Sequence, residues 1–315
     1  MADRPIDRRR GRISLGAYLR RRARQGEKTI IGYLPGLYPN PESFSRNLAR
    51  LVAHGVRAVE IGVSATAPAM EGDAISAALR EVASAVPDRL ELLRRAVGAA
   101  GRAGAFPIVM AFAETLEEVG TERVVAEAAQ AGAAAMLIPD LDREGRVLLS
   151  AACAAAGIET VAFLGAEDDP RGGNAARVPD AELVQGTEAF AYLQTADMPT
   201  GGRFEPGEEL ARRVSELRAL RASGDTLPIA LGFGLQTSDD VKAAHELGAD
   251  IAVVGTAMVK AAAAGEGRFQ AYLDALTGAG AWREHEPDRE QGPKQEPEQE
   301  PEQEAARINP EANDE

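Results

Sequence analysis

Two carboxylates eleven residues apart are the side chains of this sequence best suited to acid–base chemistry. Glu60 lies in a short apolar run, Ala58 to Val63, and Glu71 follows it across a loop. An acid is costly to bury in such a run, so Glu60 indicates either a charged partner, such as a neighbouring arginine, or a chemical role. Two carboxylates that meet at one site can act as general acid and general base.

Other aromatic and acidic side chains follow apolar runs elsewhere in the chain. They are Phe112, Glu114, Asp140, Tyr192 and Asp197. If these runs are parallel strands of a barrel, the residues gather at the carboxyl ends of the strands, where such barrels build their active sites. Asp140 has a second interpretation that fits equally well, as the N-cap of the helix that follows it.

Glycines cluster after the last three apolar runs and indicate an anion site. The segments are Thr200-Gly201-Gly202, Gly232-Phe233-Gly234 and Gly255-Thr256. Glycines let backbone N–H groups approach an anion, and a helix N-terminus, as predicted at Thr256, offers unpaired donors. Each glycine alone could be only a turn residue. Together, at the loops that usually bind phosphate in barrels, they favour a small phosphate-bearing substrate.

Eight short apolar segments are predicted to form the strands that position these groups. They cover residues 28–36, 57–63, 106–113, 133–140, 158–165, 188–194, 227–233 and 249–255. Their apolar residues mostly do not alternate with polar ones, as is typical of parallel strands that are covered on both faces. Because each strand is followed by a helical pattern, the sequence predicts a closed (β/α)₈ TIM barrel.

Helical patterns follow the strands, and one precedes the first strand. They cover residues 14–25, 43–55, 73–82, 90–104, 115–132, 143–157, a short piece near 179–186, 205–224, 238–248 and 256–278. Ser14 is a candidate N-cap for the N-terminal helix, which would cover one end of the barrel. Gly55, Gly132, Gly157 and Gly248 are placed to end helices before strands.

The composition divides the chain into three parts. Residues 1–12 form a charged, aperiodic segment that is predicted to be a flexible basic arm, and residues 13–280 form the barrel. Residues 281–315 contain a QEPEQEPEQE repeat and few apolar side chains, so we expect a disordered acidic tail. From Trp282 onward the tail carries 12 acidic and 4 basic residues, a net charge of −8, so the rest of the chain carries −6 of the total −14.

The charge and cysteine content narrow the choice of partner and compartment. A net charge of −14 argues against nucleic acid or an anionic membrane as partner. The one cysteine, Cys153, lies in an alanine-rich helical run and is expected to be a buried structural thiol. No signal peptide or long apolar stretch is present, and we expect a cytoplasmic protein. His54, His245 and His285 lie away from the strand ends, so a metal site is not expected.

With Glu60 in an E-I-G-V run, Glu71-Gly72 after it, the GFG of residues 232–234 and the VVGTAMVK of residues 253–260, the chain resembles the tryptophan synthase α chain. The resemblance covers about residues 14–278. It implies a barrel lyase that cleaves indole-3-glycerol phosphate to indole and glyceraldehyde 3-phosphate without a cofactor of its own. It also implies a partner, a β chain that uses pyridoxal phosphate and receives the indole.

The resemblance assigns roles to residues of this sequence. Glu60 matches the family's catalytic glutamate and would shuttle the proton, and Glu71 matches its catalytic aspartate and would hold the indole N–H. The substrate and phosphate contacts implied by position are Tyr33, Phe112, Tyr192, Gly201, Phe233, Gly234, Gly255 and Thr256.

The departures from the family pattern lie near function. The second acid is one methylene longer, as Glu71, and the residue at the β-chain contact is Ala67 where the family has an aspartate. Glu114 stands in place of an asparagine. We therefore expect weak association with a β chain. Two alternatives stay open, namely another phosphate-binding barrel enzyme and a non-catalytic relative that only binds a partner.

Overall fold

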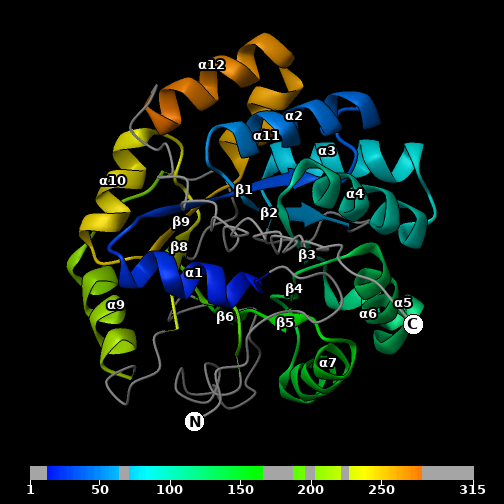
Figure 1. Ribbon diagram of the computed structural model, residues 1–315, viewed down its shortest axis with the longest axis horizontal. Helices are drawn as coiled ribbons and strands as arrows, with labels where there is room; N and C mark the ends of the chain where they lie inside the picture. The colour runs from blue at the N-terminus through cyan, green and yellow to red at the C-terminus, as the bar shows by residue number, and fades with distance from the viewer. Residues whose placement is uncertain (1–12, 64–70, 166–186, 196–202, 221–226, 279–315) are drawn as a thin grey trace, which may run out of the picture. The chain divides into compact units, whose positions relative to one another are not determined.

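A computed structural model describes residues 13–63, 71–165, 187–195, 203–220 and 227–278. The predicted basic arm, the acidic tail and the short helix near 179–186 lie outside these residues. Within them, parallel strands form a ring that is surrounded by helices (Figure 1). The structure confirms the predicted (β/α)₈ TIM barrel.

Nine strand segments form one parallel sheet, ordered β5-β4-β3-β2-β1-β9-β8-β7-β6. Their bounds are β1 Thr29–Pro35, β2 Ala58–Gly62, β3 Phe106–Met110, β4 Ala135–Leu137, β5 Glu159–Thr160, β6 Ala162–Leu164, β7 Ala191–Gln194, β8 Ile229–Gly232 and β9 Ile251–Val254. The predicted fifth strand is divided at Val161 into β5 and β6. β5 pairs with β4 and β6 pairs with β7, so this one segment closes the barrel.

Eleven helices lie in the described part of the chain. Their bounds are α1 Leu15–Arg24, α2 Pro41–Ala53, α3 Asp73–Ala85, α4 Arg89–Ala103, α5 Ala113–Val119, α6 Thr121–Ala131, α7 Arg143–Ala156, α9 Glu208–Leu220, α10 Ser238–Glu246, α11 Thr256–Ala263 and α12 Glu266–Thr277. Two predictions of a single helix were wrong, at 115–132 and 256–278. Gly120 and Gly265 each have φ of 94°, a backbone conformation that ends one helix and starts the next.

Glycines end helices where the sequence predicts them. Gly55, Gly132, Gly157 and Gly248 all have positive φ, which is the left-handed conformation of a helix C-terminus. Cys153, in α7, is fully buried and unbonded to another cysteine, as expected. Burial, and secondly the charge of Glu188, raise the pKa of this thiol to about 12. It is therefore an unreactive core residue.

Helix α1 forms the floor of the barrel and crosses in front of the strands in Figure 1. Ser14 caps it, as predicted, by accepting a hydrogen bond from the Ala17 N–H. Leu15, Tyr18 and Leu19 pack in one cluster with the inward-facing side chains of the strands. The carboxylate of Glu159, at the start of β5, accepts a hydrogen bond of 2.7 Å from the Gly16 N–H. The N-terminal helix therefore closes the end of the barrel opposite the carboxyl ends of the strands.

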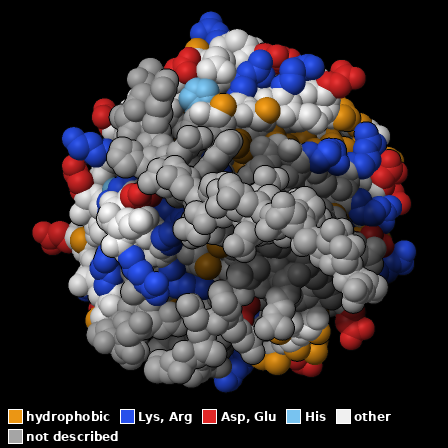
Figure 2. Space-filling view, in the orientation of Figure 1, with side chains coloured by type: hydrophobic (Ala, Val, Ile, Leu, Met, Phe, Trp, Pro, Cys, Tyr) orange, Lys and Arg blue, Asp and Glu red, His pale blue; other side chains and the backbone are white. Residues whose placement is uncertain are grey.

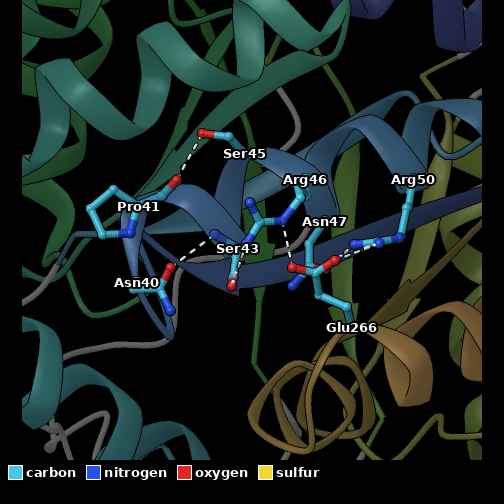
Figure 3. Close-up of polar contacts among 8 residues, drawn as sticks. All are labelled: Asn40, Pro41, Ser43, Ser45, Arg46, Asn47, Arg50 and Glu266. Carbon is cyan, nitrogen blue, oxygen red and sulfur yellow. Dashed lines mark hydrogen bonds and ion pairs between the residues drawn. The ribbon is translucent and has the colours of Figure 1, made fainter.

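Helix α2, which follows the first strand, and α12, the last described helix, are joined by charged side chains (Figure 3). Arg46 and Arg50 of α2 both pair with Glu266 in the first turn of α12, the second at 2.8 Å. One turn further along, His54 contacts Asp274 at 2.9 Å. These contacts lie at the surface, so they fix the alignment of the two helices more than they stabilise the fold.

Basic side chains gather at the end of α1. The last turn of α1 contains Arg21, Arg22 and Arg24. Figure 2, in the orientation of Figure 1, shows Lys and Arg side chains gathered near this helix and charges of both signs around the rim. None of the described helices is long and apolar enough to cross a membrane.

We predict that Leu19→Ala destabilises the barrel by about 2–5 kcal/mol, because it leaves a cavity under the strands. Leu19 is 1% exposed, whereas Leu148 of α7 is 55% exposed. Leu148→Ala is the matched control and should change the free energy of unfolding by less than about 0.5 kcal/mol. Urea unfolding of both variants tests the role of α1. Equal small losses would show that α1 is not part of the core.

Candidate active site

The register of the strands places a tyrosine and an acid side by side inside the barrel. Tyr33 of β1 is paired with Glu60 of β2, and Glu60 is paired with Ile108 of β3. Paired residues of neighbouring parallel strands face the same side of the sheet. Ile108 belongs to the cluster that fills the barrel above α1. Tyr33 and Glu60 therefore lie on the inner face of the barrel.

One pocket opens at the carboxyl ends of the strands and collects most of the predicted site residues. Nine of them line it: Tyr33, Glu60, Glu71, Phe112, Tyr192, Phe233, Gly234, Gly255 and Thr256. The tenth, Gly201, lies outside the described residues. The structure thus brings both carboxylates and the predicted phosphate residues to one place, while their roles stay predictions.

Glu60 is the more deeply buried of the two acids in the pocket. Its side chain is buried, with 4% of the residue exposed, and its Oε1 has no hydrogen-bond partner in the described part of the chain. No described arginine or lysine pairs with it, which argues against a structural ion pair. Burial, and secondly the charge of Glu71, raise the pKa of Glu60 to about 8. Such a carboxyl is mostly protonated at neutral pH and can donate a proton.

Glu71 reaches the same pocket from the start of the segment that leads into α3. It is 9% exposed. The Ser76 hydroxyl of α3 donates a hydrogen bond of 3.1 Å to the Glu71 carbonyl oxygen, which fixes this backbone relative to the helix. The charge of Glu71 acts on Glu60, Tyr33 and Tyr192, so all four groups share one electrostatic environment.

Aromatic rings form one wall of the pocket. Tyr192 of β7 lies 5.4 Å from Phe163 of β6 and 6.2 Å from Phe233 after β8, measured between ring centroids. A Cβ built on Gly232 would lie 2.0 Å from the Tyr192 hydroxyl, so only glycine leaves room for this tyrosine. The ring planes are tilted by 41° and 84°, so the wall offers both ring faces and ring edges to an aromatic ligand.

The N-terminus of α11 is open to an anion. Gly255 occupies the N-cap position, no side chain caps the helix, and its first turn contains no acid. Among the described helices whose N-caps are defined, α11 is the only one that lacks both a capping side chain and a first-turn acid. Its first N–H groups and the positive end of its dipole are therefore available to a phosphate.

Three of the other candidates do not belong to the pocket or are not described. Glu114 pairs with Arg89 of α4 at 2.8 Å and does not line the pocket. Asp140 is not the N-cap of α7, which is Asp142. Instead, its carboxylate accepts a hydrogen bond of 2.8 Å from the Ala113 N–H and so holds the start of α5. Asp197 lies outside the described residues.

Eight further residues line the pocket that the sequence did not single out. They are Ile75, Met110, Leu137, Pro139, Phe163, Leu235, Gln236 and Val253. Met110, Leu137 and Phe163 are inward-facing residues at or near strand ends. The strand register shows that their side chains face the same side of the sheet as Glu60. A register assumed from the predicted barrel would therefore have identified them. Among the described residues, no group of three or more His, Cys, Asp or Glu side chains is placed to hold a metal ion.

Comparisons with known proteins give one consistent result. The family model described as tryptophan synthase alpha chain matches residues 19–280. The tryptophan synthase alpha chain of Prochlorococcus marinus (strain MIT 9313) is 29% identical over 240 residues, which are 76% of this chain and 83% of that protein. The alpha chain of Rhizorhabdus wittichii is 30% identical over 259 residues, with coverage of 80% and 91%.

Solved structures share the fold. A structure of Mycobacterium tuberculosis tryptophan synthase matches with a TM-score of 0.70 and 23% identity, over 84% of this chain and 96% of that one. Tryptophan synthase subunit alpha from Legionella pneumophila matches with a TM-score of 0.63 and 20% identity, over 84% and 97%.

We predict that Glu60→Gln stabilises the protein at alkaline pH and has little effect at acid pH. Burial raises the pKa of Glu60 from its ordinary 4.5 to about 8, so the folded chain holds a proton that the unfolded chain releases. The free energy of unfolding therefore falls as pH rises from about 4.5 to 8, by up to about 1.4 kcal/mol per pH unit. Glutamine cannot ionise. Melting temperatures of both proteins at pH 5 and pH 8.5 test this, and a difference independent of pH would contradict it.

Proposed function

Because this chain belongs to the tryptophan synthase alpha chain family and is a lyase of tryptophan biosynthesis, we propose that it cleaves indole-3-glycerol phosphate at the pocket lined by Glu60 and Glu71. The observation that carries the proposal is the buried Glu60 carboxyl with its pKa of about 8, in a pocket that also contains a second acid. Retro-aldol cleavage needs such a group to give and take a proton near neutral pH.

Glu60 acts first as an acid and then as a base. Its protonated carboxyl gives a proton to C3 of the indole ring, and the resulting carboxylate takes the proton of the adjacent chain hydroxyl. Glu71 accepts a hydrogen bond from the indole N–H and stabilises the positive charge on the ring nitrogen. The bond between C3 and the chain then breaks, its electrons return to the ring, and indole and glyceraldehyde 3-phosphate form.

The ends of the substrate have matching surfaces in the pocket. The rings of Phe163, Tyr192 and Phe233 suit the flat indole, and the open N-terminus of α11 with Gly234 suits the phosphate. A Cβ on Gly234 would lie 2.7 Å from the Phe204 nitrogen, so this turn excludes larger residues. The proposed reaction uses only proton transfers by side chains, so we propose that the chain needs no cofactor of its own.

We predict that the purified protein releases indole from indole-3-glycerol phosphate and that Glu60→Gln lowers kcat/KM at least about 100-fold, because the proton shuttle is lost. Glu114→Gln makes the same chemical change at an acid that pairs with Arg89 away from the pocket, and it should leave kcat/KM within about twofold. Indole formation is followed by absorbance or chromatography.

The result also separates the alternatives. No indole from the wild-type protein, alone or with a β chain, would end the proposal and favour another substrate or a binding role. Glu71→Asp tests the role of the second acid. If this variant releases more indole than the wild-type protein, the extra methylene of Glu71 lowers the activity of a site that is otherwise like that of the family. Loss of activity in both glutamine variants would point to a folding defect rather than to chemistry.

We also propose that a tryptophan synthase β chain, with its pyridoxal phosphate, is the partner, and that the association is weak. The support comes from the sequence between β2 and α3, outside the described residues, where Ala67 replaces the acid that the family places at the subunit contact. Loss of a charged hydrogen bond at an interface costs on the order of 2–5 kcal/mol. That loss is enough to turn a nanomolar complex into a micromolar one.

We predict a micromolar or weaker Kd in calorimetric titration with a β chain, and indole release that changes little on addition of that chain. Ala67→Asp should tighten binding if the missing acid is the cause. Ala67→Asn, which restores size but no charge, is the matched control and should tighten it less. Nanomolar binding by the wild-type chain, with strong activation of cleavage, would show that other residues have rebuilt the contact.

A further inference from the structure

The Tyr33 hydroxyl is a buried hydrogen-bonding group that the cleavage described above does not use. Tyr33 lines the pocket and is 4% exposed. Its hydroxyl oxygen has no hydrogen-bond partner in the described part of the chain. A phenylalanine would fill the same apolar space without this cost, and a buried polar group left unpaired in a folded protein calls for an explanation.

The backbone keeps a place for this hydroxyl. The Tyr33 ring starts beside Gly255, where an ideal Cβ would lie 3.6 Å from the Tyr33 Cβ. It ends over Gly62, where an ideal Cβ would lie 2.4 Å from the hydroxyl oxygen. Any larger residue at position 62 would displace the hydroxyl. The tyrosine therefore spans from the predicted phosphate end of the pocket to the strand that carries Glu60.

The hydroxyl lies close to the proposed proton shuttle. Tyr33 is the register partner of Glu60, and Gly62 follows Glu60 by two residues on the same face of β2. The hydroxyl thus lies level with Gly62, two residues closer to the mouth of the pocket than the Glu60 backbone. Oε1 of Glu60 is also without a partner in the described part of the chain, so the two groups do not satisfy each other. The phenol can donate to an acceptor, and the Glu60 carboxylate that remains after proton transfer to the ring can accept from a donor.

A ligand hydroxyl, like the water molecule that it would replace, can satisfy both at once. It accepts through its oxygen lone pairs and donates through its hydrogen, whereas a phosphate or carbonyl oxygen can only accept. We propose that Tyr33 is a further catalytic residue, which donates a hydrogen bond to the substrate hydroxyl whose proton Glu60 removes. The proposal rests on the proposed cleavage for the identity of that hydroxyl.

The donor role suits the bond that breaks. As Glu60 takes the proton, negative charge develops on the substrate oxygen before it becomes the aldehyde oxygen, and a preplaced donor stabilises that charge. Burial, and then the charges of Glu71 and Glu60, raise the pKa of Tyr33 well above its usual range. The phenol therefore keeps its proton and remains a donor throughout the reaction.

The test compares Tyr33→Phe with the wild-type protein toward two compounds. One is indole-3-glycerol phosphate, and the other is indole-3-propanol phosphate, which lacks the chain hydroxyls. We expect Tyr33→Phe to lower kcat/KM for the first about tenfold or more and to leave the Kd of the second within twofold. Because the hydroxyl has no partner among the described residues, the melting temperature should stay the same or rise. Tyr272→Phe is the matched control, since its hydroxyl donates a hydrogen bond of 2.8 Å to the Gln236 carbonyl oxygen, and it should lower the melting temperature.

The outcomes separate this proposal from the cleavage itself. If Tyr33→Phe lowers kcat/KM for the substrate and weakens binding of indole-3-propanol phosphate by the same factor, the substitution acts through the ring and not through the hydroxyl. If neither value changes, the hydroxyl contacts only water. Either result overturns the proposal. If the wild-type protein releases no indole, the proposed function fails, and calorimetry with the two uncleaved compounds decides the role of Tyr33. If Tyr33→Phe binds indole-3-glycerol phosphate more weakly than the wild-type protein does but binds indole-3-propanol phosphate equally well, the contact is supported. If it binds both compounds as the wild-type protein does, the proposal is overturned.

Discussion

The burial of one carboxyl inside a closed barrel is the constraint on which the rest of the site depends. Glu60 is held between β1 and β3 by strand pairing that leaves the residue only 4% exposed. In that environment the charged form is disfavoured, and the nearby charge of Glu71 disfavours it further. The raised pKa is therefore a property of the fold as much as of the residue.

Keeping an acid there requires that the surrounding barrel be rigid and well packed. The strand pairings hold the walls, and α1 closes the floor by packing Leu15, Tyr18 and Leu19 against the inner face of the strands. The split strand β5/β6 completes the ring because its halves pair with different neighbours. A looser ring would admit water to Glu60 and return its pKa toward that of an exposed glutamate. Helix α1 at one end of the barrel thus helps to maintain the raised pKa of Glu60 near the other end.

Much of this could be predicted from the sequence, for identifiable reasons. Short apolar strands, helix-ending glycines such as Gly55 and an acid within a strand are local signals, and they gave the barrel and the position of Glu60. The breaks at Gly120 and Gly265 were missed because helical periodicity continues across them, and only the backbone angles reveal the turns. Asp140 was misplaced because it holds α5, an element that precedes it by many residues, and such a contact leaves no trace in spacing.

The tyrosine hydroxyl could not have been predicted at all. Any aromatic residue at position 33 fits the sequence pattern, and the significance of the phenol depends on which atoms surround it after folding. Gly62 appeared in the sequence only as part of a strand end, yet its missing side chain is what admits the hydroxyl. Whether a buried polar group has a hydrogen-bond partner depends on the tertiary structure. It can therefore be judged only when the distances between atoms are known.

The site also divides into parts with different tolerance for sequence change. Glu60 and Tyr33 come from paired strands, and the uncapped N-terminus of α11 directly follows β9, so all three are fixed by the packing of the barrel. Of the residues that depart from the family pattern, Glu71 lines the pocket and Glu114 lies in α5, whereas Ala67 lies outside the described residues. A loop substitution can change contacts with a partner without altering strand register or the burial of Glu60. The proposed proton transfer and the proposed partner binding therefore depend on different residues, so a substitution that weakens one need not abolish the other.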